Sequence, residues 1–229
     1  MRNAFAWAGA LLFLLSLLSF GLIYGWRLRL PSPGPLSAGW RDALGNVVLF
    51  TIFALHHSIM ARTGAKAWIT RFVPPSLERA VYVWIASLLF LAACWLWQPL
   101  PGIVWETGGV VSWILFAMQM CGVALTLRAA RIVGVWELAG IRQPDLTKPV
   151  TFTAAGPFGI VRHPIYLGWI VIVFAIPVMT TSRLLFAVVS TAYLVAAIPL
   201  EEASLVEAFG ERYRAYQRQM KWRLIPGIW

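Results

Sequence analysis

Long apolar blocks constrain the fold of this chain more than any other feature of its sequence. They cover residues 4–26, 43–61, 80–98, 109–130, 165–181 and 184–200. An α-helix rises 1.5 Å per residue, so about 20 apolar residues cross a hydrocarbon core roughly 30 Å thick. Of the 229 residues, 60% are hydrophobic and only 12% are charged. This composition excludes an ordinary soluble domain, a secreted disulfide scaffold and a disordered chain.

The pattern predicts an all-α fold, a polytopic integral-membrane helix bundle of about six spans in a lipid bilayer. The last two spans are short, and we expect them to form a hairpin in which Pro177 bends the first helix. After Glu201, apolar residues recur at three- and four-residue steps, which predicts an amphipathic C-terminal helix. Its apolar positions are Val206, Phe209, Tyr213, Tyr216 and Met220.

The net charge of +10 comes from Lys and Arg residues that lie between the apolar blocks. They do not form one continuous basic surface, so we expect no nucleic-acid partner. We expect instead that they determine which loops face the cytoplasm. Residues 62–79 are rich in basic side chains, whereas residues 98–110 contain none. Because basic loops face the cytoplasm, loop 62–79, the connection 131–164 and the C-terminal tail are predicted to be cytoplasmic, in a bacterial inner membrane. Tryptophans near the span ends are expected at the interfaces: Trp26, Trp40, Trp68, Trp95, Trp97, Trp105 and Trp113.

Two cysteines and two adjacent histidines lie inside apolar blocks. Cys94 and Cys121 are expected to be buried thiols, with neither a disulfide nor a metal site. His56 and His57 allow three interpretations: interhelical hydrogen bonding, a base that acts on a substrate, or a haem or metal ligand. Neighbouring helical residues point about 100° apart, so the two histidines cannot hold one metal together.

Ionisable residues at the edges of the last two spans are the strongest candidates for chemistry, because charges are costly in a membrane. Arg162, His163 and Tyr166 stand at the start of the fifth block, and Glu201 and Glu202 stand at the end of the sixth. A hairpin that crosses and returns brings Glu202 back to the face of the membrane where His163 lies. A loop rich in glycine and proline, 140–164, lies beside them.

Three motifs in this region carry a resemblance to a known family. They are GPFGIVRHPIYLG at 156–168, EEASL at 201–205 and FGERYRAY at 209–216. Together they resemble the isoprenylcysteine carboxyl methyltransferase and phospholipid methyltransferase superfamily. In the N-terminal half, FALHHSIMAR at 53–62 and FVPP at 72–75 resemble the methanethiol S-methyltransferase and NnrU-like branch.

The resemblance implies S-adenosylmethionine (SAM) as cofactor, bound on the cytoplasmic side by a core formed by residues 140–229, with residues 1–139 forming four further spans. It assigns cofactor contacts to Gly156, Pro157, Gly159, His163, Tyr166, Glu201, Glu202 and Tyr213. Arg162 is expected to face the negative charge of the acceptor, and His57 to act as a base on the acceptor side.

The function predicted on this basis is methyl transfer to a thiol or carboxylate of a small or lipid-borne acceptor. An anionic nucleophile and a sulfonium neutralise each other during transfer, so a dry pocket inside a helix bundle favours the reaction. The second hypothesis is a non-enzymatic, NnrU-like haem or metal protein built on His56 and His57. The sequence leaves the acceptor and the oligomeric state open.

Overall fold

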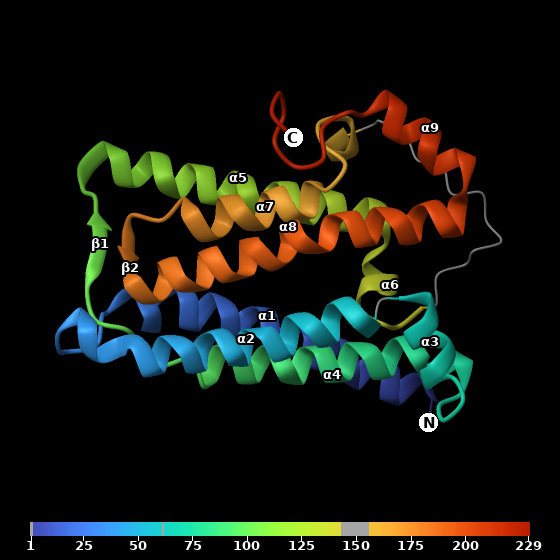
Figure 1. The fold of residues 1–229 in the computed structure, drawn as a ribbon, viewed down its shortest axis with the longest axis horizontal. Coiled ribbons are helices and arrows are strands. Elements are labelled where there is room, and N and C mark those ends of the chain that lie inside the picture. The colour runs from blue at the N-terminus through green and yellow to red at the C-terminus, as the bar shows by residue number, and fades with distance from the viewer. Residues whose placement is uncertain (1, 61, 143–155) are drawn as a thin grey trace. The chain divides into compact units, whose positions relative to one another are not determined.

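Six apolar helices account for the six apolar blocks. The computed structural model describes residues 2–60, 62–142 and 156–229 (Figure 1). The helices are α1 (Arg2–Gly25), α2 (Trp40–Met60), α4 (Pro75–Trp95), α5 (Gly109–Val133), α7 (Pro164–Phe174) and α8 (Thr181–Phe209). All but α7 are long and apolar enough to cross a membrane, which confirms the predicted all-α membrane bundle. The part of loop 140–164 at residues 143–155 lies outside the described residues.

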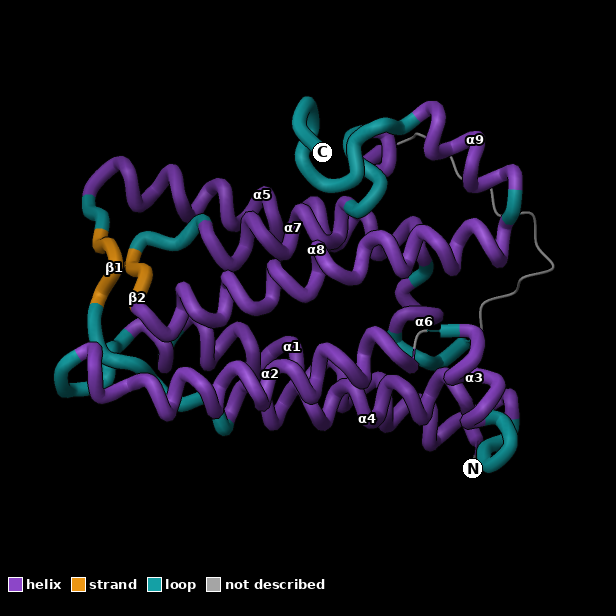
Figure 2. Tube along the Cα trace, viewed as in Figure 1, coloured by secondary structure: helices purple, strands orange, loops and turns teal. Residues whose placement is uncertain are grey.

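The last two spans differ in length from the prediction. Helix α7 has only 11 residues and ends at Phe174, so Pro177 lies beyond it and does not bend it. The residue before a proline avoids helical geometry, and here the chain continues as an extended strand, β2 (Val178–Thr180), paired antiparallel with β1 (Ile103–Glu106). Figure 2 shows these strands in orange among the purple helices. Helix α8 then runs for 29 residues, with Pro199 inside it.

The first of two compact units contains residues 1–107, 136–143 and 177–190. Its longest helices are α1, α2 and α4, and α3 (Thr63–Ile69) follows α2. Phe186, at the start of α8, lies 5.5 Å from Phe20 and 5.1 Å from Trp97 between ring centroids. Trp97 is completely buried. The prediction that Trp97 lies at the interface is therefore wrong, because aromatic packing inside the unit holds it.

Arg183 fixes the C-terminal end of α1 within this unit. Its Nε donates to the carbonyl oxygen of Tyr24 at 2.9 Å, Nη2 donates to that of Gly25 at 2.7 Å, and Nη1 donates to that of Val178. The side chain is among the largest that are fully buried. A cation at a helix C-terminus satisfies its last carbonyls and complements the helix dipole, so Arg183 ties α1, β2 and α8 together.

The second unit contains residues 108–135, 144–176 and 191–229. Helices α5 and α7 approach closely at Gly122 and Gly168, where a Cβ on Gly168 would lie 2.8 Å from the carbonyl oxygen of Gly122. Gln119 Nε2 also donates to the carbonyl oxygen of Ile172 at 2.8 Å. Small residues of this kind let membrane helices pack backbone to backbone.

The predicted amphipathic C-terminal helix is divided in two. Helix α8 continues through Glu202 to Phe209, Gly210 then adopts φ of +55°, and α9 (Glu211–Gln219) follows. A positive φ is a conformation that glycine adopts at little cost and that ends a helix. The single-helix prediction is therefore wrong, although α9 does bury one face through Tyr213 and Tyr216.

Candidate active site

Arg162 and Glu202 form a buried ion pair in the second unit. Arg162 Nε donates to Glu202 Oε1 at 2.7 Å and Nη2 donates to Oε2 at 3.3 Å. The two side chains are only 7% and 6% exposed. Paired geometry of this kind is the strongest form of arginine–carboxylate contact, and a buried charge needs such a partner.

Glu202 accepts contacts from three further side chains. Gln217 Nε2 donates to Oε2 at 3.2 Å, Arg223 Nε lies 3.4 Å from Oε2, and His163 Nε2 lies 3.2 Å from Oε1. Both carboxylate oxygens are thus shared among cations and an amide. Glu202 therefore holds the side chains of Arg162, His163, Gln217 and Arg223 in position.

Glu201 is the more open of the two carboxylates. Its side chain is 43% exposed, and its Oε2 lies 3.5 Å from His163 Nδ1. Tyr166 donates its hydroxyl to the same oxygen at 2.7 Å and stacks against the His163 ring, with centroids 5.4 Å apart. The predicted meeting of residues 162–166 with residues 201–202 is confirmed by these distances.

The protonation of His163 follows from this setting. Burial lowers the pKa of the imidazole, but the hydrogen bonds and charges of Glu201 and Glu202 outweigh it, and the pKa lies above its ordinary value. When it is protonated, His163 joins Arg162 and Arg223 as a third positive group that faces the two carboxylates.

The C-terminal tail supplies backbone to the site. Arg162 N donates to the carbonyl oxygen of Trp222 and His163 N to that of Arg223, each at 2.9 Å. Arg162 Nη1 also donates to the carbonyl oxygens of Met220 and Lys221. The tail thus orients the Arg-His pair just before α7, where Pro164 begins the helix.

A tyrosine cluster packs beside the charged groups. Tyr213 and Tyr216 are buried together with Met220, and Phe158 and Phe209 pack against them. Tyr216 donates its hydroxyl to the carbonyl oxygen of Phe158 at 2.8 Å. Burial raises the pKa of Tyr216 to about 12, against the opposing charge of Arg162, and burial also raises the pKa of Tyr213. Both phenols therefore stay neutral.

The remaining predicted residues lie in two places. Gly156, Pro157 and Gly159 form a short 3₁₀ turn, Gly156–Gly159, in the second unit, where Gly156 has φ of +58°. His57 belongs to the first unit, where its Nδ1 lies 2.9 Å from the hydroxyl of Tyr82. Both ring nitrogens of His56 are buried and have no hydrogen-bond partner among the described residues.

Sequence reasoning missed Gln217, Arg223 and the backbone of residues 220–223. Gln217 and Arg223 are ordinary surface residue types, and backbone contacts leave no mark on composition. One signal was available for Gln217, which lies four residues from Tyr213 and therefore on the same side of the helix.

The chain is similar to several known proteins. A family model described as phospholipid methyltransferase matches residues 107–212. The methanethiol S-methyltransferase of Mycobacterium tuberculosis is 38% identical over 95% of this chain and 94% of its own length. Methanethiol S-methyltransferase 2 of Bradyrhizobium diazoefficiens is 35% identical over 81% of this chain and 73% of its own length. Nurim of Rattus norvegicus is 27% identical over 88% of this chain and 79% of its own length. No solved structure matches the chain.

An apolar helix bundle that carries these motifs and matches this family model is an integral-membrane methyltransferase. The chain belongs to the family of the methanethiol S-methyltransferases, within the wider group of phospholipid methyltransferase-like membrane enzymes. The resemblance found in the sequence and the prediction of a methyltransferase are thereby confirmed.

Proposed function

We propose that this enzyme transfers a methyl group from SAM to the sulfur of a small thiol, with methanethiol as the first acceptor to test. The observation that carries the proposal is the alignment with a methanethiol S-methyltransferase over 94% of that protein's length. A carboxylate acceptor, as in isoprenylcysteine methylation, is the competing choice.

The donor set at the Arg162–Glu202 cluster fits SAM, a zwitterion with a ribose and a flat base. Glu201 is half-exposed and suits the amino group or the ribose, and Arg223, 37% exposed, suits the carboxylate. Tyr166 and His163 line the same edge, the turn at Gly156, Pro157 and Gly159 offers backbone contacts, and Tyr213 closes the apolar side. Glu202 holds Arg162 and His163 in place. We thus propose residues 140–229 as the SAM-binding core.

Bound SAM would supply a methyl group on a positively charged sulfonium. The chain must then keep water out and favour the thiolate form of an acceptor whose thiol has a pKa of about 8.5. Arg162 contributes positive charge to the site, and Arg223 lies beside it at Glu202. In a low-dielectric site that charge stabilises a thiolate more than it does in water.

His57 is the proposed base for the acceptor thiol. Its Nδ1 lies 2.9 Å from the Tyr82 hydroxyl, which orients the ring, and a neutral imidazole can take a thiol proton. A His57→Asn variant is expected to lose turnover at neutral pH and to recover part of it at a pH where the thiol ionises by itself, with SAM affinity unchanged.

We also propose that the site faces the cytoplasm of a bacterium, because SAM is polar and the basic residues Arg162, Lys221 and Arg223 gather there. A reporter fused to the C-terminus tests this. Activity of a reporter that works only outside the cytoplasm would contradict it.

The deciding experiment uses the whole chain purified in detergent. Calorimetry measures SAM binding, and radiolabelled SAM is offered with methanethiol, longer alkyl thiols and a prenylcysteine. We expect SAM to bind and label to move to the thiols, with KM falling as the chain lengthens if the acceptor enters from the bilayer. Label on the prenylcysteine alone would favour a carboxylate acceptor. Absence of SAM binding together with a Soret band would overturn the proposal in favour of a haem protein.

A further inference from the structure

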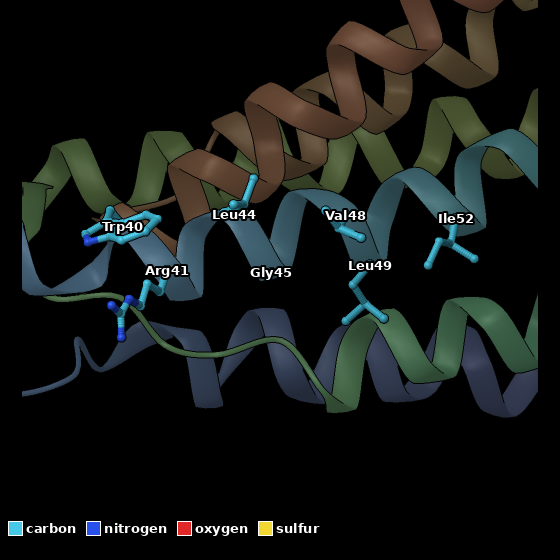
Figure 3. Close-up of a pocket in the computed structure, with 7 residues that line it drawn as sticks. All are labelled: Trp40, Arg41, Leu44, Gly45, Val48, Leu49 and Ile52. Atoms are coloured by element: carbon cyan, nitrogen blue, oxygen red, sulfur yellow. The ribbon is translucent and has the colours of Figure 1, made fainter.

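Helix α2 carries a groove on its exposed face that the methyl-transfer site does not use. The groove is shallow and open, with a volume of about 590 Å³, and it is lined by residues of α2 alone, from Trp40 to Ile52. Figure 3 shows their side chains, with Arg41 and Leu49 on one side of the helix and Leu44 on the other. Every residue of the lining belongs to the first unit.

A missing side chain creates the hollow. Gly45 lies between the larger residues, and a Cβ built on it would meet no atom within 4 Å. Leu44, Val48 and Ile52 are all about half-exposed and continue the apolar surface along the helix. From Arg41 to Ile52 the stripe is roughly 16 Å long at 1.5 Å per residue, a length that suits part of an acyl chain.

One end of this apolar groove carries a positive charge. The Arg41 guanidinium lies 5.3 Å from the centroid of the Trp40 ring, in a cation–π contact, and Trp40 is 61% exposed. Tryptophan and arginine at the end of a spanning helix mark the headgroup level of a bilayer. Asp42 is the next residue and is also exposed, but it points about 100° away around the helix.

We propose that this groove binds an anionic phospholipid, with the phosphate at Arg41 and Trp40 and one acyl chain over Gly45 along Val48 and Ile52. Charge complementarity selects the occupant, because a neutral apolar chain needs no cation at the mouth of the groove. Arg41 near a membrane surface contributes about fivefold to the affinity for an anionic lipid.

The test is native mass spectrometry of the whole protein in detergent with equal amounts of phosphatidylglycerol and phosphatidylcholine. The unaltered protein is expected to retain phosphatidylglycerol preferentially. Arg41→Gln should weaken phosphatidylglycerol binding about fivefold without affecting phosphatidylcholine, and Arg41→Lys should keep most of the preference.

Filling the groove provides the second arm. Gly45→Leu should reduce retention of both lipids, because the new side chain occupies the hollow. Gly21→Leu is the matched control: Gly21 lies on the exposed face of α1, and a Cβ there also meets no atom within 4 Å. It should leave lipid retention unchanged, and size-exclusion profiles verify that each variant is folded.

Three outcomes would overturn the proposal. They are equal retention of the two lipids by the unaltered protein, no effect of Arg41→Gln, and equal effects of the two glycine substitutions. A dimer that Gly45→Leu dissociates would assign the groove to a second copy of the chain. None of these outcomes bears on methyl transfer, so the lipid-binding proposal is tested independently of the proposed enzymatic function.

Discussion

Among the residues that the structure describes, two arginine side chains are buried, Arg183 in the first unit and Arg162 in the second, and their partners differ in kind. Arg183 donates to three backbone carbonyls, those of Tyr24, Gly25 and Val178. Arg162 shares its donors between the Glu202 carboxylate and two carbonyls of the tail. Backbone carbonyls cannot titrate or be exchanged, whereas the cluster around Arg162 contains groups that change charge. From this difference we infer that the first arginine serves the fold and that the second serves the proposed SAM site.

The largest expected effect is on stability and concerns Arg183. Arg183→Met keeps most of the volume but leaves three carbonyls without their donor, which should lower the free energy of unfolding by about 2–5 kcal/mol. Thermal unfolding in detergent measures the loss, and SAM affinity of the folded fraction should stay constant. Arg183→Lys, which keeps the charge, should recover part of the loss. A SAM affinity that falls together with stability would contradict the division of roles.

Glu202→Gln should produce the second largest effect, this time on SAM binding. The amide keeps the shape but loses the charge that fixes Arg162 and His163. A charge-assisted hydrogen bond contributes about 1.5–3 kcal/mol, so SAM affinity should fall roughly ten- to a hundredfold. Calorimetry measures the dissociation constant. The control is Glu207→Gln, because Glu207 is an exposed glutamate on the same helix and its substitution should leave the dissociation constant unchanged. Equal dissociation constants for the two variants would show that Glu202 takes no part in SAM binding.

The sequence was sufficient to predict that each apolar block forms a helix and that the two motifs meet, but not where α7, α8 and α9 begin and end. Apolar block length determines where membrane helices lie, and a chain that crosses and returns brings residues 162–163 near Glu202. The match to the family followed from the same motifs. These features are encoded locally, in runs and spacings that can be read directly.

Other features depend on contacts that have no local signature. The carbonyls of Trp222 and Arg223 bind the backbone of residues 162–163, and any residue type could supply them. Arg183 lies between two apolar blocks of the sequence, and only its contacts with the carbonyls of α1 and β2 explain why it is buried. Helix α8 ends where Gly210 adopts a positive φ. The apolar residues continue at helical spacing on both sides of Gly210, so the sequence pattern gives no sign of this break.

Arg162→Lys tests whether the positive charge of Arg162 is sufficient or whether its planar guanidinium group is needed. Lysine keeps the positive charge but has no planar fork, so it cannot hold Glu202 and the carbonyls of the tail at once. We expect turnover to fall about tenfold, or roughly 1.4 kcal/mol in activation free energy, with a smaller change in SAM affinity. Steady-state kinetics at saturating SAM measures the effect, and Arg212→Lys, at an exposed position of α9, is the control. If SAM affinity collapses while turnover at saturation stays normal, Arg162 belongs to cofactor binding.

The smallest expected effect is a dependence of stability on pH that only the Arg162 region should show. The pKa of His163 is raised in the folded protein, so the folded state binds the proton more tightly than the unfolded state does. The resulting stabilisation is complete below the ordinary histidine pKa of about 6.5 and disappears as pH rises through the higher folded value.

Melting temperatures measured in detergent between about pH 6 and pH 9 test this expectation. The unaltered protein should lose stability as pH rises, and His163→Asn should show a flatter profile, so that the two curves converge at high pH. His57→Asn is the matched control, because it removes a histidine of the other unit and should leave the slope unchanged. Parallel curves for the unaltered protein and His163→Asn would show that the carboxylates do not hold the His163 proton. The cluster would then be as insensitive to pH as the carbonyls around Arg183, and the distinction between the two arginines would fail.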